Sequence, residues 1–291
     1  MTCKATLRDK GIKPIPKIPC CSQLKHWRRI TMMSVTYKIT AKVIALRLTP
    51  ALDRVITPQH GFIKKRSIYD NILAAIVGIE YARCTKQECI LLQIDLDKAY
   101  DRIEWKCIEE VMSVLGFGPR MCSIVRTLGE GSILELLFNN KIVGSFEVKR
   151  SIKQGYAMAP LLFALGSHPL VAALEASADK GEIQGLELPR GKRLLAKLFA
   201  DDSLLFLKAN FDILRKALQI IQLFATASGS KCNIEKSRLI SLTEGDSFDP
   251  SSWSGEVISK GTIVRHLGVP IGVDVTDKQR LEWVMERIKK K

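Results

Sequence analysis

A pair of adjacent aspartates between two apolar runs, in the segment LLAKLFADDSLLFL at 194–207, constrains the fold more than any other feature of this sequence. Short apolar runs bounded by polar residues are typical of buried strands, so 194–200 and 203–207 are predicted to form a hairpin with Asp201 and Asp202 at its turn. Aspartate favours turns, which explains one of the two residues. Neighbouring carboxylates repel each other unless a cation or solvent offsets their charge, so the pair also indicates a functional site.

A second apolar run delivers another carboxylate, in the segment LLQIDLDKAYDRIEW at 91–105. Residues 89–94 are predicted to form a buried strand with Asp95 at its end. Capping of the following helix explains Asp101 but not Asp95. A strand-end carboxylate and a hairpin-tip pair supply the oxygen ligands that Mg²⁺ prefers. Two such ions about 4 Å apart would activate the attacking oxygen and stabilise the leaving oxygen of an in-line displacement. A two-metal site is therefore one interpretation of these carboxylates, and ordinary turns and helix caps are the other.

The order of predicted elements indicates an α+β fold, because the hairpins imply antiparallel pairing. Residues 1–30 are interpreted as an extended arm, and 244–260 as a linker. Ser67 is a candidate N-cap with Asp70 in the first turn of its helix. Helices are predicted at 34–55, 67–84, 103–115, 119–128, 161–178, 211–227 and 277–290, and strands at 89–94, 132–138, 141–148, 194–200, 203–207, 238–242 and 262–269.

Charge is concentrated at the start of the chain. Residues 1–90 hold 17 Lys and Arg against 5 Asp and Glu, so they carry +12 of the formal net charge of +15. Such a block commonly contacts nucleic acid, although a solvated surface is the alternative. The hydrophobic fraction of 46% excludes a disordered chain. The 8 Cys form no CxxC motif, and no 18-residue uncharged apolar run exists, so neither a zinc site nor a membrane protein is expected.

Seven segments, in order, resemble the sequence boxes of the reverse transcriptases of non-LTR (long interspersed element type) retrotransposons, in the plant-like style. FADD and IDLDKAYDR are similar to the metal-binding box and the first box of the palm. The segments are WRRITMMSVTYKITAKVIALRL at 27–48, GFIKKRSIYDNIL at 61–73, IDLDKAYDR at 94–102, RSIKQGYAMAPLLFAL at 150–165, FADD at 199–202, SGSKCNIEKS at 228–237 and HLGVPIG at 266–272.

The resemblance implies an α+β right-hand polymerase with fingers, a palm and a truncated thumb. The fingers would occupy 1–90 and the palm 91–243, with part of 103–150 packing with the fingers; 244–291 would be a linker and the start of the thumb. Asp95, Asp201 and Asp202 match the catalytic carboxylates that hold two Mg²⁺, with Mn²⁺ as an alternative ion. Asp95 and Asp201 would be the main metal ligands, with Asp202 supporting. Lys236 matches a lysine that could protonate the leaving pyrophosphate, unless it is an ordinary surface lysine.

Further matches imply the substrate contacts. The residues expected at the dNTP are Arg28, Arg66, Leu96, Tyr100, Gln154 and Gly155, and those expected at nucleic acid are Lys64, Lys65, His266, Leu267 and Gly268. Tyr100 would stack under the sugar and exclude a 2′-OH, or it is a core aromatic. A glycine at 155 would let the backbone approach the substrate closely. Lys64 and Lys65 would contact phosphates, or they are solvated charges.

The resemblance implies a function with named partners: RNA-directed DNA synthesis on an RNA template with a DNA primer and dNTPs, inside the cell and in the nucleus. Departures from the family pattern are Arg29 in place of Pro, and Tyr156-Ala157-Met158 in place of Cys-Pro-Leu. The chain is expected to be a piece of a longer reading frame that lacks an endonuclease domain. A catalytically inactive remnant that only binds nucleic acid is one alternative, and a maturase-like RNA-binding protein is another. An RNA-directed RNA polymerase is disfavoured by Tyr100.

Overall fold

The computed structural model describes residues 11–16, 27–56, 67–139, 141–148, 150–153, 155–199, 202–242, 248–250 and 253–289. Contacts divide the chain into two compact units. Unit 1 comprises residues 1–57, 98–167 and 227–229, and unit 2 comprises residues 58–97, 168–226 and 230–291. The predicted boundary between fingers and palm at 90/91 therefore falls inside unit 2, and the division into fingers, palm and thumb stays a prediction.

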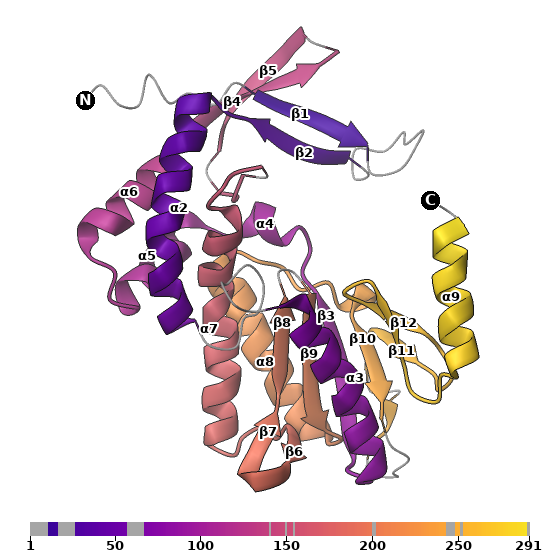
Figure 1. Cartoon of the computed structure of the whole chain (residues 1–291). Helices are drawn as coiled ribbons and strands as arrows, with labels where there is room; N and C mark the ends of the chain where they lie inside the picture. The colour runs from indigo at the N-terminus through magenta and orange to yellow at the C-terminus, as the bar shows by residue number, and fades with distance from the viewer. Residues whose placement is uncertain are drawn as a thin grey trace. The chain divides into compact units, whose positions relative to one another are not determined.

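Helices and strands alternate in the mixed order expected of an α+β chain (Figure 1). The helices are α2 (Val35–Val55), α3 (Ile68–Cys84), α4 (Ala99–Arg102), α5 (Trp105–Val114), α6 (Pro119–Gly129), α7 (Ala159–Asp179), α8 (Phe211–Ser228) and α9 (Asp277–Lys289). The strands are β1 (Gly11–Pro16), β2 (Trp27–Met32), β3 (Cys89–Asp95), β4 (Ser132–Phe138), β5 (Lys141–Val148), β6 (Leu186–Leu188), β7 (Lys192–Leu194), β8 (Ala196–Phe199), β9 (Asp202–Lys208), β10 (Arg238–Ser241), β11 (Glu256–Ile258), β12 (Val264–His266) and β13 (Val269–Ile271).

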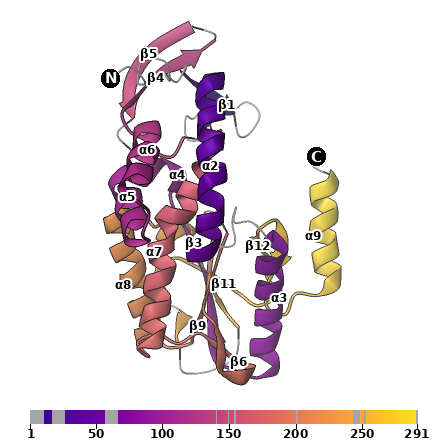
Figure 2. The same cartoon turned by 60° about the vertical axis from the view of Figure 1, so that its left-hand side comes forward.

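The main sheet of unit 2 has five strands in the order β11-β10-β3-β9-β8. Strand β3 pairs antiparallel with both β9 and β10. Five of its seven residues are buried, as the apolar run CILLQI predicts: Cys89, Ile90, Leu91, Leu92 and Ile94. Burial on both faces needs cover on both sides, which α3 supplies on one face and α8 on the other (Figures 1 and 2). The α3 face packs Ala75 and Ile79 against Leu91, Leu204 and Phe206.

Helix α3 begins as the sequence predicts. Ser67 accepts a hydrogen bond from the Tyr69 backbone N–H, and Asp70 accepts one from the Ser67 N–H, which completes a capping box. Farther along, the fully buried Asn71 donates from Nδ2 to the Leu198 carbonyl at 3.0 Å. This hydrogen bond ties the helix to β8, the strand that leads to the predicted carboxylate turn.

Unit 1 contains a four-stranded sheet in the order β2-β1-β4-β5. The prediction of an extended arm at 1–30 was wrong for its described part, because β1 and β2 form an antiparallel hairpin from Gly11↔Met32 to Pro16↔Trp27. Strand β1 also pairs with β4, but only at Ile12↔Leu136. Its two prolines, at 14 and 16, lie beyond that pairing, where the missing N–H costs no hydrogen bond to β4.

Two other predictions near the C-terminus were also wrong. The predicted strand at 262–269 is split into β12 and β13, which form a hairpin around Leu267 and Gly268. Both of these residues have positive φ, 48° and 88°, and so reverse the chain. The predicted linker at 244–260 contains buried Phe248 and Trp253 and the strand β11, which pairs parallel with β10. Its described part is therefore integrated into unit 2.

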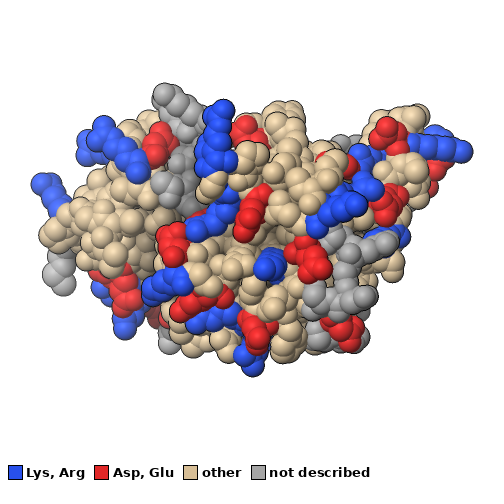
Figure 3. Space-filling model, turned by 90° about the horizontal axis from the view of Figure 1, so that it is seen from below, with Lys and Arg blue, Asp and Glu red and all other residues tan. Residues whose placement is uncertain are grey.

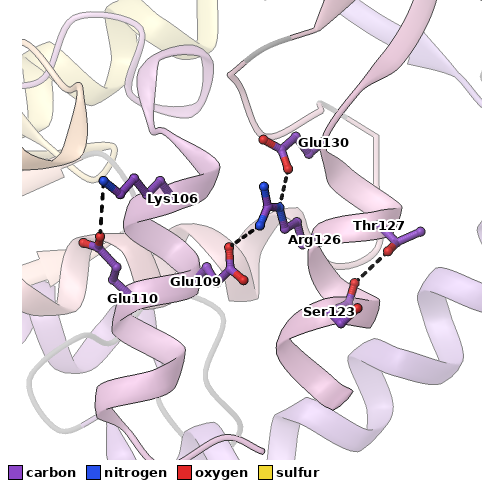
Figure 4. Close-up of polar contacts among 7 residues, drawn as sticks. All are labelled: Lys106, Glu109, Glu110, Ser123, Arg126, Thr127 and Glu130. Atoms are coloured by element: carbon purple, nitrogen blue, oxygen red, sulfur yellow. Dashed lines mark hydrogen bonds and ion pairs between the residues drawn. The ribbon is translucent and has the colours of Figure 1, made fainter. Parts of the chain in front are cut away.

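Helices α5 and α6 of unit 1 lie side by side and are joined by surface ion pairs (Figure 4). Arg126 bridges Glu109, at 3.1 Å, and Glu130, while Lys106 and Glu110 pair along α5 at 3.8 Å. Exposed ion pairs of this kind contribute little, roughly 0–1 kcal/mol each. The apolar contact beneath them, between Gly129 and the buried Trp105, matters more.

Gly129→Ala is expected to lower the free energy of unfolding by about 1–3 kcal/mol. A Cβ at this position would clash with the Trp105 ring, so the indole or the helix must shift. Better helix propensity offsets at most about 1 kcal/mol of that cost. Chemical denaturation followed by tryptophan fluorescence measures the change. Gly144→Ala is the matched control, since its Cβ meets nothing within 4 Å; equal midpoints for the two variants would contradict the clash.

Charge and hydropathy add two observations. The face of the molecule in Figure 3 carries Lys and Arg interspersed with Asp and Glu, so the excess positive charge is not segregated there.

Among the described residues, one helix, α7, is long and apolar enough to cross a membrane, and 61% of its most apolar window is buried inside the protein. A mostly buried helix of this kind is also typical of the core of a globular protein.

Candidate active site

The register of the main sheet in unit 2 places Asp95 directly opposite Asp202. Asp95 is the last residue of β3 and Asp202 the first residue of β9, so both carboxylates lie at the same end of neighbouring strands. Side chains of directly opposed residues in an antiparallel pair project from the same face, with Cα atoms roughly 4.5–5.5 Å apart. Both residues are half-buried. Two of the three predicted catalytic carboxylates are therefore neighbours.

The hairpin that presents Asp202 follows from its apolar runs. Strand β8 ends at Phe199 and pairs with β9 through Phe199↔Asp202, as the sequence predicts. Leu204 to Leu207 are buried and hold β9 in the sheet. The remaining predicted carboxylate, Asp201, precedes β9 and lies outside the described residues.

The backbone of Asp95 is held by the segment 231–237, which is part of the SGSKCNIEKS box. Its N–H donates to Ser237 Oγ at 3.1 Å, and its carbonyl accepts from the Asn233 N–H at 2.8 Å. The buried Ser237 hydroxyl in turn donates to the Asn233 carbonyl at 2.8 Å. These contacts fix the end of β3 and thereby position Asp95. The sequence analysis assigned no role to Ser237 or Asn233.

The next two residues are held by the same segment. Leu96, a predicted dNTP contact through its carbonyl, forms an isolated antiparallel bridge with Cys232, and the Asp97 N–H donates to the Lys231 carbonyl at 2.8 Å. Burial raises the pKa of the Cys232 thiol, and the nearby Asp95 raises it further, while a hydrogen bond with Ser237 lowers it. Cys232 thus stays a neutral thiol beside the carboxylates. Lys236 is exposed on a short 3₁₀ turn, and its catalytic role stays a prediction.

Tyr100 and Gly155, two predicted substrate contacts, belong to unit 1. The Tyr100 ring stacks on Phe163 with centroids 4.5 Å apart, which supports the packing role that was the alternative for this residue. Its carbonyl accepts from the Ile152 N–H at 2.7 Å. Gly155 is exposed and has a φ of +90°, a conformation that a side chain would strain. Its role at the nucleotide, like the sugar-gate role of Tyr100, stays a prediction.

Unit 1 also contains a pocket of about 420 Å³ with mixed charge, which the sequence analysis did not predict. Its lining includes four cations, Lys98, Arg102, Arg150 and Lys153, and two carboxylates, Asp101 and Glu147. Lys153 is 3% exposed, and its ammonium lies 5.0 Å above the ring of Tyr37 and 3.5 Å from the hydroxyl. In the sequence, Lys98 and Arg102 lie within IDLDKAYDR, and Arg150 and Lys153 lie within RSIKQGYAMAPLLFAL.

The remaining predicted site residues are placed as follows. Arg66, Gln154, Lys64 and Lys65 lie outside the described residues, and Arg28 lies in β2 but its side chain is not among those described. The imidazole of His266 is packed inside unit 2 and is 1% exposed. This burial lowers the pKa of His266 to about 4. Leu267, which is half-buried, and Gly268, which is exposed, form the turn after His266. Contact of these three residues with a primer stays a prediction.

The donor set at the carboxylates suits a hard divalent cation. Within the described ranges, no group of three or more His, Cys, Asp or Glu side chains is gathered to hold a metal ion. The opposed pair supplies up to four carboxylate oxygens, and Asp201 directly precedes Asp202 in the sequence. Carboxylate oxygens are what Mg²⁺ prefers, and it usually takes only one or two such residues with water and phosphate. The residues present therefore fit the expected ion.

Comparison with known proteins decides the family. The family model described as reverse transcriptase (RNA-dependent DNA polymerase) matches residues 15–271, which is most of the chain. The chain belongs to the reverse transcriptase family. This confirms the family resemblance given by the seven sequence boxes, and the pairing of Asp95 with Asp202 lies inside the matched range.

This reverse transcriptase domain is similar to proteins of non-LTR retrotransposons. It is 26% identical over 265 residues to the transposon TX1 uncharacterized 149 kDa protein of Xenopus laevis, covering 89% of this chain and 20% of that protein. It is 24% identical over 229 residues to the retrovirus-related Pol polyprotein from type-1 retrotransposable element R2 of Popillia japonica, covering 78% and 31%. The chain thus spans less than a third of the length of these relatives.

Solved structures confirm the fold of the reverse transcriptase domain. Telomerase from Candida albicans matches with a TM-score of 0.62 at 11% identity, covering 94% of this chain and 47% of that one. Apo telomerase from Candida tropicalis matches with a TM-score of 0.59 at 14% identity, covering 92% and 54%. At these identities the likeness shows the right-hand polymerase fold alone.

Proposed function

We propose that this domain catalyses RNA-directed DNA synthesis, extending a primer 3′-OH on an RNA template with dNTPs. The observation that carries the proposal is the register of β3 and β9, which opposes Asp95 and Asp202 at the ends of two buried strands. A structural turn has no need for a second carboxylate from another strand, whereas a metal-dependent nucleotidyl transferase does.

Asp95, Asp202 and Asp201 would hold two Mg²⁺, with Mn²⁺ as a substitute. When bound, the ions supply a lowered pKa for the attacking hydroxyl and neutralise charge on the phosphates. The chain's own part is to keep its carboxylates in place. The hydrogen bonds from Asn233 and Ser237 hold the backbone of Asp95, and the ladder to β3 holds Asp202, so little reorganisation is required when substrate binds.

Polyanionic substrates also need cations, and unit 1 offers them. Its pocket carries four Lys and Arg against two carboxylates, and the predicted dNTP residue Arg28 lies in the same unit. Arg and Lys favour phosphate oxygens through charge-assisted hydrogen bonds. This charge supports binding of a nucleic-acid backbone or a triphosphate by unit 1.

The test is a primer-extension assay with the purified chain, an RNA template annealed to a DNA primer, and the four dNTPs. Mg²⁺ should support extension and an excess of EDTA should abolish it. A chain that binds the template-primer but incorporates no dNTP with either Mg²⁺ or Mn²⁺ would instead be the non-catalytic remnant.

Tyr100→Ala is expected to relax the preference for dNTPs over rNTPs by about tenfold or more, because steric rejection of one hydroxyl is worth that order of discrimination. Relative incorporation of dNTP and rNTP by the same primer-extension assay measures this. Tyr100→Phe keeps the ring and the Phe163 stacking, so it serves as the control and should discriminate like the wild type. Unchanged rNTP rejection in a folded Tyr100→Ala protein would assign the ring to packing alone.

A further inference from the structure

Helix α2 of unit 1 presents a row of large apolar side chains that the unit leaves exposed. The row consists of Val35, Ile39, Val43 and Leu46, whose exposed fractions are 71%, 61%, 43% and 60%. Their spacing of four, four and three residues places them on one side of the helix. At 1.5 Å per residue the row is about 16 Å long, or three turns.

The opposite side of α2 already packs in the core of unit 1. The residues buried there are Tyr37, Ala41, Ile44, Ala45, Leu48 and Leu52. The Tyr37 hydroxyl also donates to the Leu128 carbonyl of α6. No other helix of unit 1 lies in front of α2 in either of the two views (Figures 1 and 2). A surface helix needs one apolar stripe to join its core, so the second row has no role in the packing of the unit.

Cations flank the exposed row on both sides. With about 100° between successive residues, Lys38 and Lys42 fall along one side of the row and Arg47 lies on the other side, at its end. Arg54 is on the same side as Arg47, about 12 Å beyond Leu46. All four are exposed, and in the part of the chain that the structure describes none of their side chains forms an ion pair. The helix contains one acidic residue, Asp53.

We propose that this row is a docking surface for an amphipathic protein helix with acidic residues on both sides of its own apolar stripe. Burial of the four apolar side chains would supply the affinity, and the flanking cations would select acidic partners and fix their orientation. A second copy of α2 is the wrong partner, since it would bring the same cations into contact. Nucleic acid is also disfavoured, because the centre of the surface offers phosphates no donor. This partner surface goes beyond the proposed polymerase activity.

The experiment compares two synthetic helical peptides of about four turns, which is about one turn longer than the row. Both carry leucines at i, i+3, i+4 and i+7; one has Glu and the other Lys at the flanking positions. Fluorescence anisotropy with the whole purified chain should show binding of the Glu peptide only. The double variant Ile39→Gln/Leu46→Gln should weaken that binding about tenfold or more. Lys42→Glu/Arg47→Glu should reverse the preference toward the Lys peptide.

Val114→Gln is the matched control, because Val114 lies in α5 of the same unit and is 86% exposed. Circular dichroism establishes that every variant is folded. The proposal is overturned if neither peptide binds, if both bind equally, or if the control weakens binding as much as the α2 variant. Sedimentation velocity on the chain alone would overturn it as well, if it showed self-association that Ile39→Gln/Leu46→Gln removes.

Discussion

Replacing Asp95 or Asp202 by alanine is expected to reduce primer extension by about a thousandfold or more. Metal ions stabilise the transition state of phosphoryl transfer by several kcal/mol, and loss of a ligand forfeits much of it. The two positions are expected to behave alike, because they oppose each other in one ladder. Rates of single-nucleotide incorporation on an RNA template measure the effect.

Controls separate catalysis from folding in this experiment. Asp212→Ala removes another carboxylate of unit 2, one that is exposed and pairs with Arg215 at the start of α8, and it should leave the rate unchanged. Asp95→Asn keeps the side-chain shape and leaves the backbone contacts to Ser237 and Asn233 available, so it should bind template-primer yet remain inactive. Substantial extension by either Asp95→Ala or Asp202→Ala would remove the carboxylate pair from the mechanism.

The sequence was sufficient to predict which residues form the site, but not how those residues are arranged in space. The apolar runs before Asp95 and around Asp202 are short enough to be recognised as strands, and the turn chemistry of aspartate places the hairpin. Which residue of β3 faces Asp202 depends on the cross-strand register, and this is decided by packing of both sheet faces. A pattern in one strand cannot supply it.

The hydrogen bonds that hold the backbone of Asp95 could not be predicted from the sequence for a related reason. Its contacts join Asp95 to Asn233 and Ser237, which are about 140 residues away in the chain. Ser and Asn at that position read locally as turn residues, and only the tertiary structure brings them to β3. Strand β1 was missed because Pro14 and Pro16 argue against a strand, and pairing of β1 with β4 at a single position removes that objection.

Acidification is expected to destabilise the fold through His266. Burial lowers the pKa of this imidazole to about 4, whereas an unfolded chain has a value of about 6.5. A group with a depressed folded pKa favours folding while both states are neutral, so its contribution is complete above about pH 6.5. It is lost as the pH falls toward about 4, where the folded state is protonated too. For this residue alone the loss between about pH 7 and about pH 5 is roughly 2 kcal/mol.

His266→Phe isolates that contribution, because it keeps an aromatic ring in place of a buried imidazole whose two nitrogens have no hydrogen-bond partner among the described residues. Urea denaturation at both pH values should give a free energy of unfolding that falls less steeply with acid in the variant. Burial also lowers the pKa of His168, which therefore remains to destabilise both proteins in the same direction. Parallel pH profiles for wild type and His266→Phe would mean that His266 is solvated in the folded protein. An accessible imidazole would in turn favour the predicted contact of His266 with the primer.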